Sequence, residues 1–209
     1  MDRRVLKTRS AIRNAYISLL MEKKSMKMTV TELAKKANID RKTFYLHYET
    51  TDDVMRDYNK QLIQELLTLL EKQDFFNQNF NTVSLYSALN RIISDNLEFF
   101  RHIARMDYAD SFWEQSKEAL TVGICNMYKE KILVSEDAMK LYSRFILSGT
   151  LEIYREWLKG NLPFSLEELG RFTSEVAFRG FAPALKCGKE NNSETEGELQ
   201  HEQLQNDNL

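Results

Sequence analysis

The chain has 209 residues, 43% of them hydrophobic, and a formal net charge of −2, which describes a globular protein with enough apolar material for a core. Its seven Gly and two Pro are few for this length and no run of alternating β-branched residues occurs, so the sequence predicts an all-α fold. No stretch approaches about 18 uninterrupted apolar residues, and the charged N-terminus lacks the apolar core of a signal peptide, which excludes a membrane segment and predicts a cytoplasmic protein.

The first predicted helix covers residues 3–23, where apolar side chains recur on one face. These are Val5, Ala11 or Ile12, Ala15, Tyr16, Leu19 and Leu20. Four cations crowd its beginning: Arg3, Arg4, Lys7 and Arg9. Positive charge at a helix N-terminus is unfavourable against the helix dipole. The cluster therefore invites an external explanation, for which phosphate contacts or an arm into a DNA minor groove would serve, and a solvated charged end is an equal alternative for each residue.

Residues 28–48 predict two short helices joined by a tight turn. Thr29 and Glu32 have the spacing of a capping box, so a helix starts at Thr29. Its apolar face consists of Val30, Leu33, Ala34 and Ala37. Asn38 tolerates the left-handed conformation of a helix end, and Asp40 can cap the second helix.

The second of these helices presents a basic, hydrogen-bonding surface. Phe44 and Tyr48 are predicted to face inward because they lie four residues apart. The side chains left outside, none of them acidic, are Arg41, Lys42, Thr43, Tyr45 and His47. From spacing alone, an ordinary helical hairpin with a solvated basic face remains the alternative.

The sequence TFYLHY, followed by ETTDDVM, resembles the N-terminal signature of the TetR family of bacterial transcription regulators. That signature is a Thr-capped helix, a tight turn and a recognition helix, followed by a polar cap and a new helix. Two positions depart from it: Asn38 replaces the usual Gly of the turn, and Thr51 replaces a common Lys that contacts a phosphate. The resemblance implies a three-helix head with a helix-turn-helix, whose candidate DNA-binding residues are Thr29, Thr31, Arg41, Lys42, Thr43, Tyr45, His47 and Tyr48.

The charges of the chain are unevenly distributed. Residues 1–60 hold 14 Lys and Arg against 8 Asp and Glu, whereas the remainder holds 15 against 23. A basic head on an acidic body is the distribution expected of a nucleic-acid binder, and it supports the resemblance.

A long helix is predicted from its cap at Thr50 to about Lys72. It is too long for the head alone, so we interpret it as a connector between the head and a helical body. Residues 73–82 interrupt the pattern and predict a loop. Further helices are predicted over 83–105, 108–132 and 135–159.

The body helices carry aromatic side chains on their apolar faces, which favours a cavity for a small-molecule effector between bundle helices. The candidate effector-pocket residues are Tyr86, Phe100, His102, Phe112, Trp113, Tyr128 and Tyr142. Packing in an ordinary core is the alternative for each aromatic residue, and a satisfied or surface imidazole is the alternative for His102.

Residues 144–169 resemble the C-terminal part of many TetR-type regulators. A long helix ends at Gly160, and Ser165 with Glu168 forms the capping box of a last helix that reaches about residue 182. These two helices present more apolar surface than one small body can cover. The resemblance implies a homodimer with a four-helix interface, whose candidate residues are Phe145, Gly149, Ile153, Leu169, Phe172 and Val176.

We therefore expect a DNA-binding domain over residues 1–50, an effector-binding and dimerisation domain over 51–186, and a disordered acidic tail over 187–209. Cys125 and Cys187 are expected to be free thiols, since they show no metal-ligand spacing.

Enzymatic chemistry is not expected, and no cofactor or metal is implied. The three histidines, His47, His102 and His201, suggest no catalytic arrangement, and no Gly-rich phosphate loop occurs. The sequence predicts a transcriptional regulator that reads a near-palindromic operator in double-stranded DNA, as a repressor that a small-molecule effector releases. The alternatives are an activator with the same fold, or a protein-interaction adapter or coactivator without a small-molecule ligand.

Overall fold

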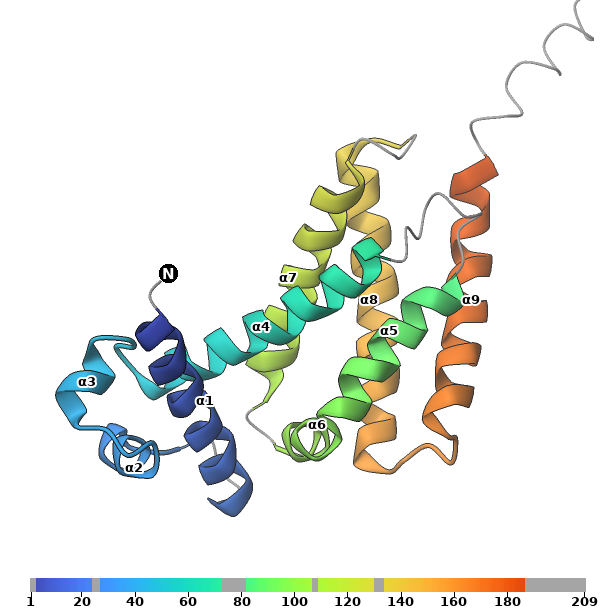
Figure 1. Ribbon diagram of the computed structural model, residues 1–209. Coiled ribbons are helices and arrows are strands. Elements are labelled where there is room, and N and C mark those ends of the chain that lie inside the picture. Colours follow the sequence, from blue (N-terminus) through green and yellow to red (C-terminus); the bar gives the residue numbers. More distant parts are fainter. Residues whose placement is uncertain (1–2, 24–26, 73–81, 107–108, 130–133, 187–209) are drawn as a thin grey trace, which may run out of the picture.

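The computed structural model describes residues 3–23, 27–72, 82–106, 109–129 and 134–186, and within these ranges its regular structure is helical throughout (Figure 1). The helices are α1 (Arg3–Lys23), α2 (Val30–Lys36), α3 (Arg41–Tyr45), α4 (Thr51–Lys72), α5 (Thr82–Asp95), α6 (Leu97–Ala104), α7 (Asp110–Tyr128), α8 (Glu136–Lys159) and α9 (Leu166–Lys186). The predicted all-α fold is confirmed. No helix in the described part of the chain has the length and apolarity that crossing a bilayer requires.

The predicted N-terminal caps are confirmed by their hydrogen bonds. The Glu32 amide donates to Thr29 Oγ1 at 3.2 Å, and the Thr29 amide donates to Glu32 Oε2 at 2.9 Å, which completes the capping box of α2. The same reciprocal pair joins Ser165 and Glu168 at the start of α9. Each box satisfies backbone donors that a helix end leaves open, so these helices begin at defined residues.

Two helix ends use the left-handed conformation. Asn38 has φ 55° and is the only described residue other than glycine with positive φ, while Gly160 has φ 92° after α8. Both positions were predicted from residue type, because Asn and Gly tolerate this region better than other residues. Asn38 thus makes the sharp turn between α2 and α3.

One body prediction was wrong: residues 83–105 form two helices, α5 and α6, instead of one. The break lies at Asn96, whose Nδ2 donates to the Ile92 carbonyl at 2.9 Å. An Asn side chain that bonds to a nearby carbonyl competes with the helical backbone. Tyr58 of α4 fixes this arrangement, because its hydroxyl donates to Asn96 Oδ1 at 2.9 Å.

The head, defined here as α1 to α3 with the segments joining them, lies at one end of the molecule, and α4 runs from it into the body (Figure 1). In the body, α7 and α8 pack side by side, and α5 lies against α9 and α4. Fully buried side chains connect both parts into one core; they include Ile12, Tyr16, Leu20, Leu33 and Phe44 in the head and Leu70, Tyr86, Ile103, Tyr154 and Leu158 in the body. The recognition segment therefore rests on a packed support.

Candidate nucleic-acid interface

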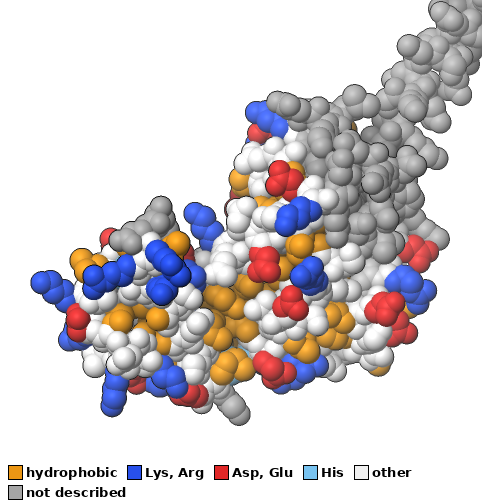
Figure 2. Space-filling view, viewed as in Figure 1, with side chains coloured by type: hydrophobic (Ala, Val, Ile, Leu, Met, Phe, Trp, Pro, Cys, Tyr) orange, Lys and Arg blue, Asp and Glu red, His pale blue; other side chains and the backbone are white. Residues whose placement is uncertain are grey.

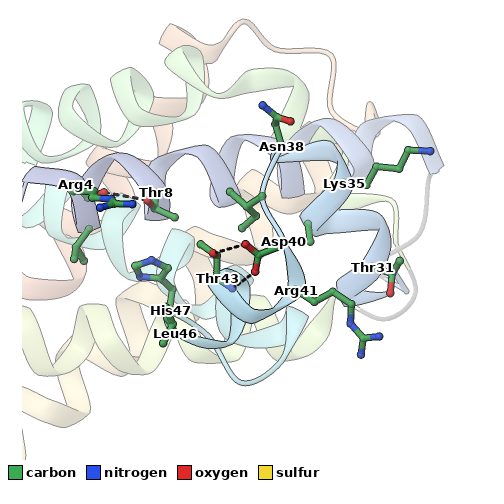
Figure 3. Close-up of a pocket in the computed structure, with 13 residues that line it drawn as sticks. Arg4, Thr8, Thr31, Lys35, Asn38, Asp40, Arg41, Thr43, Leu46 and His47 are labelled. Carbon is green, nitrogen blue, oxygen red and sulfur yellow. Dashed lines mark hydrogen bonds between the residues drawn. The ribbon is translucent and has the colours of Figure 1, made fainter.

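A broad concave surface of about 1240 Å³ lies on the head between the beginning of α1, the exposed face of α2, and α3. Figure 3 shows Arg4, Thr8, His47 and Leu46 on one side of it, with Lys35, Thr31 and Arg41 toward the other. The caps of α2 and α3 and the fully buried Phe44 fix the lining residues of these two short helices, while Arg4 and Thr8 belong to α1.

The lining of this surface carries a positive charge. Arg4, Lys35 and Arg41 are basic, whereas Asp40 is the acidic residue among the described lining side chains. The Asp40 carboxylate is engaged in capping α3: Oδ1 accepts from the Thr43 amide at 2.7 Å, and Oδ2 accepts from Thr43 Oγ1 at 3.0 Å. These hydrogen bonds lower the pKa of Asp40, so its charge is held at the helix start. Figure 2 shows further Lys and Arg side chains around the head.

The eight candidate DNA-binding residues fall into three groups. Thr31, Arg41, Lys42 and Tyr45 are exposed, and His47 is half-buried beside them. The hydroxyls of Thr29 and Thr43 take part in the caps of α2 and α3, and of these two residues Thr43 lines the concave surface. Tyr48 is buried.

Tyr48 belongs to a network that joins α1 and the end of the recognition segment to α4. Its hydroxyl donates to Asp57 Oδ2 at 2.7 Å. Arg9 Nη2 lies 2.7 Å from Asp57 Oδ1, and Arg13 Nη1 lies 2.8 Å from Oδ2. The Arg9 guanidinium also lies over the Tyr48 ring, 5.0 Å from its centroid. Arg9 is therefore an internal ion-pair partner and not one of the outward cations at the start of α1.

The charge of Asp57 is stabilised by this network. Burial acts to raise the pKa of Asp57, but the hydrogen bonds from Tyr48 and Arg13 and the charge of Arg9 outweigh it, so that the pKa lies below its usual value. The same burial raises the pKa of Tyr48, which keeps its hydroxyl protonated and able to donate. The network fixes the angle between the head and α4.

Sequence reasoning left Lys35 and Leu46 out of the candidate site. Lys35 lies four residues after Thr31 on the same exposed face of α2, so helical spacing would have found it. Leu46 lies between the inward-facing Phe44 and Tyr48, and this position predicts an outward side chain. Its apolar side chain lacks the charge and hydrogen-bonding groups by which DNA-binding residues are predicted from a sequence.

A second surface, the α8–α9 groove, is apolar and open, with a volume of about 670 Å³. Of the dimer candidates, Phe145 and Val176 are 75% and 72% exposed, Gly149 is exposed, and Ile153 and Phe172 are partly exposed. Leu169 is almost completely buried within the chain, at the base of the groove. Leu141, which the candidates did not include, is 67% exposed along the same face.

The effector-pocket candidates are divided between two places. Phe100, Phe112 and Trp113 are buried and in ring contact: the Phe112 and Trp113 centroids lie 5.4 Å apart, and those of Phe100 and Trp113 lie 6.3 Å apart. Tyr86 instead lines the α8–α9 groove, where its hydroxyl and Thr150 Oγ1 lie 3.0 Å apart.

Of the remaining effector candidates, His102 and Tyr142 are partly exposed, on α6 and α8, and the side chain of Tyr128 lies outside the described residues. The proposed tail, residues 187–209, and Cys187 lie outside them as well, whereas Cys125 is a buried free thiol.

Comparison with known proteins gives one curated relative, the uncharacterised HTH-type transcriptional regulator YxbF of Bacillus subtilis. It is 33% identical over 67 residues, which are 32% of this chain and 18% of that protein. The match thus spans less than a fifth of the relative's length. No protein-family model matches the chain.

Solved structures match over most of the chain. A TetR transcriptional regulator from Streptococcus agalactiae is 25% identical, with a TM-score of 0.58 over 84% of this chain and 96% of its own. FadR of Thermus thermophilus, a TetR-family repressor solved with lauroyl-CoA, is 19% identical, with a TM-score of 0.58 over 82% and 94%. At that identity the second match shows the fold alone.

Proposed function

We propose that this protein, a transcriptional regulator of the TetR family, binds double-stranded DNA as a homodimer through the exposed surface of its head, which comprises the concave surface and the outward side chains of α3. The observation that carries the proposal is the concentration of exposed cations around a helix-turn-helix, where Arg4, Lys35 and Arg41 face the concavity and Asp40 is held in a cap. Cations positioned on a rigid support are what phosphate contact requires.

The exposed side chains of α2 and α3 have the chemistry for both parts of DNA recognition. Lys42 and Lys35 supply charge for phosphates, while Arg41, Thr31 and Tyr45 can donate to base edges or phosphates. We assign Tyr48 a supporting role, because its ring is buried and its hydroxyl is bonded to Asp57.

The first test is the salt dependence of binding, measured on a duplex that the protein enriches from a random library. Lys42→Ala should weaken binding and reduce the slope of log affinity against log salt by about one unit if Lys42 meets one phosphate. Lys140→Ala, an exposed lysine paired with Glu136 on α8, is the matched control and should leave the slope unchanged. An unchanged slope for Lys42→Ala would remove Lys42 from the interface.

The role of Arg41 is decided by comparing the affinity of Arg41→Ala for the selected duplex with its affinity for unrelated DNA. If Arg41 reads a guanine edge, Arg41→Ala should lose about 1–3 kcal/mol on the selected duplex and much less on unrelated DNA. An equal loss on all sequences would make Arg41 a backbone contact. If the native protein enriches no DNA, the DNA-binding proposal fails and the adapter alternative takes its place.

The homodimer is supported by the α8–α9 groove. Phe145, Leu141 and Val176 expose large apolar side chains there, and an exposed apolar patch of this kind is typical of a protein interface. A second copy related by a two-fold axis would cover it with the same surface. Two recognition segments held about 34 Å apart would then meet successive turns of one face of the duplex.

Sedimentation of Phe145→Glu tests the dimer. Because Phe145 is exposed, the charge should leave the fold intact in a monomer but should be desolvated in an interface, and the variant should sediment as a monomer. Val122→Glu, at an exposed aliphatic position on α7, is the matched control and should remain dimeric. If Phe145→Glu remained dimeric, the dimer interface would have to lie elsewhere on the molecule.

Repression, and release by a small-molecule effector, stay predictions.

A further inference from the structure

We propose that Leu46 is a specificity-determining residue that reads the C5-methyl group of a thymine in the major groove. The inference rests on the proposed function, because it assumes that the head meets DNA. Leu46 is 75% exposed, which makes it the most exposed large apolar side chain described in the head. A single exposed leucine is common on protein surfaces. The position of Leu46 at the end of α3, on the proposed DNA-binding surface, is what distinguishes it from other exposed leucines.

The backbone at Leu46 is fixed. Leu46 caps the C-terminus of α3, and its amide donates to the Lys42 carbonyl at 3.2 Å. The next two amides, of His47 and Tyr48, donate to the Phe44 carbonyl at 2.9 and 3.1 Å. Phe44 is fully buried, and Tyr48 is bonded to Asp57, so the segment on both sides of Leu46 is anchored. A rigid segment presents its side chain in one direction.

Leu46 stands on a ridge between two hollows. Leu46 and His47 line the concave surface described above, and they also line a second hollow of about 600 Å³ between α3 and the first part of α4. The major groove is about 12 Å wide and is bordered by two phosphate strands. A protruding segment with a hollow on each side has the shape that enters such a groove while the two strands lie beside it.

The chemistry at the crest of the ridge is apolar. Leu46 offers no donor or acceptor, so it cannot bind a phosphate or the polar edge of a base. Thymine displays a methyl group in the major groove, the apolar group by which the groove distinguishes thymine from the other bases. Tyr45 and His47, on either side, retain polar atoms for neighbouring positions. Leu46 is therefore the residue of this ridge that is matched to a thymine methyl.

Uracil substitution isolates that methyl group, because uracil differs from thymine only there and keeps the same pairing. The experiment takes the duplex enriched by the native protein and replaces its thymines by uracil one at a time. Binding is measured for the native protein, Leu46→Ala and Val122→Ala. Val122 is an exposed aliphatic residue on the body, and its truncation controls for loss of apolar surface away from the head. Melting curves accompany each variant.

One thymine in each half-site should be sensitive: its change to uracil should weaken the native protein about fourfold, the factor for one buried methyl group. Leu46→Ala should bind the thymine duplex more weakly and should lose this sensitivity, so that the two changes are not additive. Val122→Ala should remain sensitive to the change from thymine to uracil. If no thymine is sensitive in the native protein, or if Leu46→Ala keeps the sensitivity, the inference is overturned while DNA binding stands. If no DNA is enriched at all, the proposed function itself fails.

Discussion

Head and body share an apolar core, but the head–α4 contact and the contact of α5 with α8 and α9 use different kinds of polar interaction. The head is held to α4 by Asp57, a carboxylate that pairs with Arg9 and Arg13 and accepts from Tyr48. Within the body, α5 is held to α8 and α9 by uncharged groups: the Tyr154 hydroxyl donates to Asn90 Oδ1 at 2.6 Å, and Asn90 Nδ2 donates to the Leu166 carbonyl at 2.8 Å. Ion pairs of the body join α7 to α8 instead, as between Asp110 and Arg155.

This difference determines how each part responds to its surroundings. Ion pairs whose side chains are 20–28% exposed are screened by salt and titrate with pH, whereas neutral hydrogen bonds and ring contacts do neither. The orientation of the head should therefore change under conditions that leave the contact of α5 with α8 and α9 intact. Four predictions test this contrast, from the largest expected effect to the smallest.

Trp113→Ala tests the body and should have the largest effect. Trp113 is buried in ring contact with Phe112 and Phe100, so its truncation should lower the free energy of unfolding by about 3–5 kcal/mol. Val122→Ala, on the same helix but exposed, should change it by less than about 0.5 kcal/mol. Urea unfolding followed by circular dichroism measures both. A stable Trp113→Ala protein with an altered inducer response would instead place Trp113 at an effector cavity.

Asp57→Asn tests the ion-pair network that joins the head to α4. The change keeps the shape of the side chain but leaves Arg9 and Arg13 without their counter-charge. We expect a loss of about 1–2 kcal/mol, less than for a fully buried pair because these groups are partly exposed. Operator affinity should fall, and the dimer should persist in sedimentation. Asp95→Asn, whose exposed pair with Arg91 spans 3.8 Å, is the control and should alter neither quantity. An Asp57→Asn protein with native operator affinity would contradict the positioning role of the network.

Gly170→Ala tests the uncharged contact that Asn90 makes with Tyr154 and Leu166. A Cβ at Gly170 would lie 2.6 Å from Asn90 Nδ2, so the amide must move away from Leu166 and Tyr154. The lost hydrogen bonds should exceed the helix propensity that alanine adds, giving a net loss of about 1 kcal/mol in thermal unfolding. In an Asn90→Ala background the same substitution should become stabilising, because the clash is gone. If it destabilises both backgrounds equally, Asn90 is not the cause.

The smallest effect is the acid response of the head. Because the pKa of Asp57 is lower in the folded protein, its contribution to stability is complete above its usual value of 3.8 and is lost as the pH falls through the lowered value. Native and Asp57→Asn proteins should therefore converge in unfolding free energy below about pH 4 and differ most near neutrality. If the difference in unfolding free energy stayed constant across that pH range, the lowered pKa of Asp57 would be contradicted.

The parts of the fold that the sequence predicted well are those encoded within a few residues. The capping boxes at Thr29 and Ser165 each depend on two residue types three positions apart, and the left-handed turn at Asn38 depends on one residue type. Hydrophobic spacing placed α1 and α4 for the same reason. Local patterns carry this information because a helix contacts itself at i+3 and i+4.

The parts that the sequence did not predict depend on distant partners. The helix break at Asn96 is fixed by Tyr58, 38 residues earlier, and Arg9 meets Asp57 48 residues away. Tyr48 matches the family motif, yet only the structure shows that its hydroxyl is directed to α4. Gly170 likewise accommodates the side chain of Asn90, a contact that local spacing does not reveal.

The length of α4 sets how a motion in the body is transmitted to DNA. Its 22 residues span about 33 Å at 1.5 Å per residue. A tilt of about 6° about the body end of such a rod displaces the head end by about 3.4 Å, which is the rise of one base pair along the axis of the duplex. An angular change too small to disturb the packing of a helix would thus move the recognition segment out of register by one base pair.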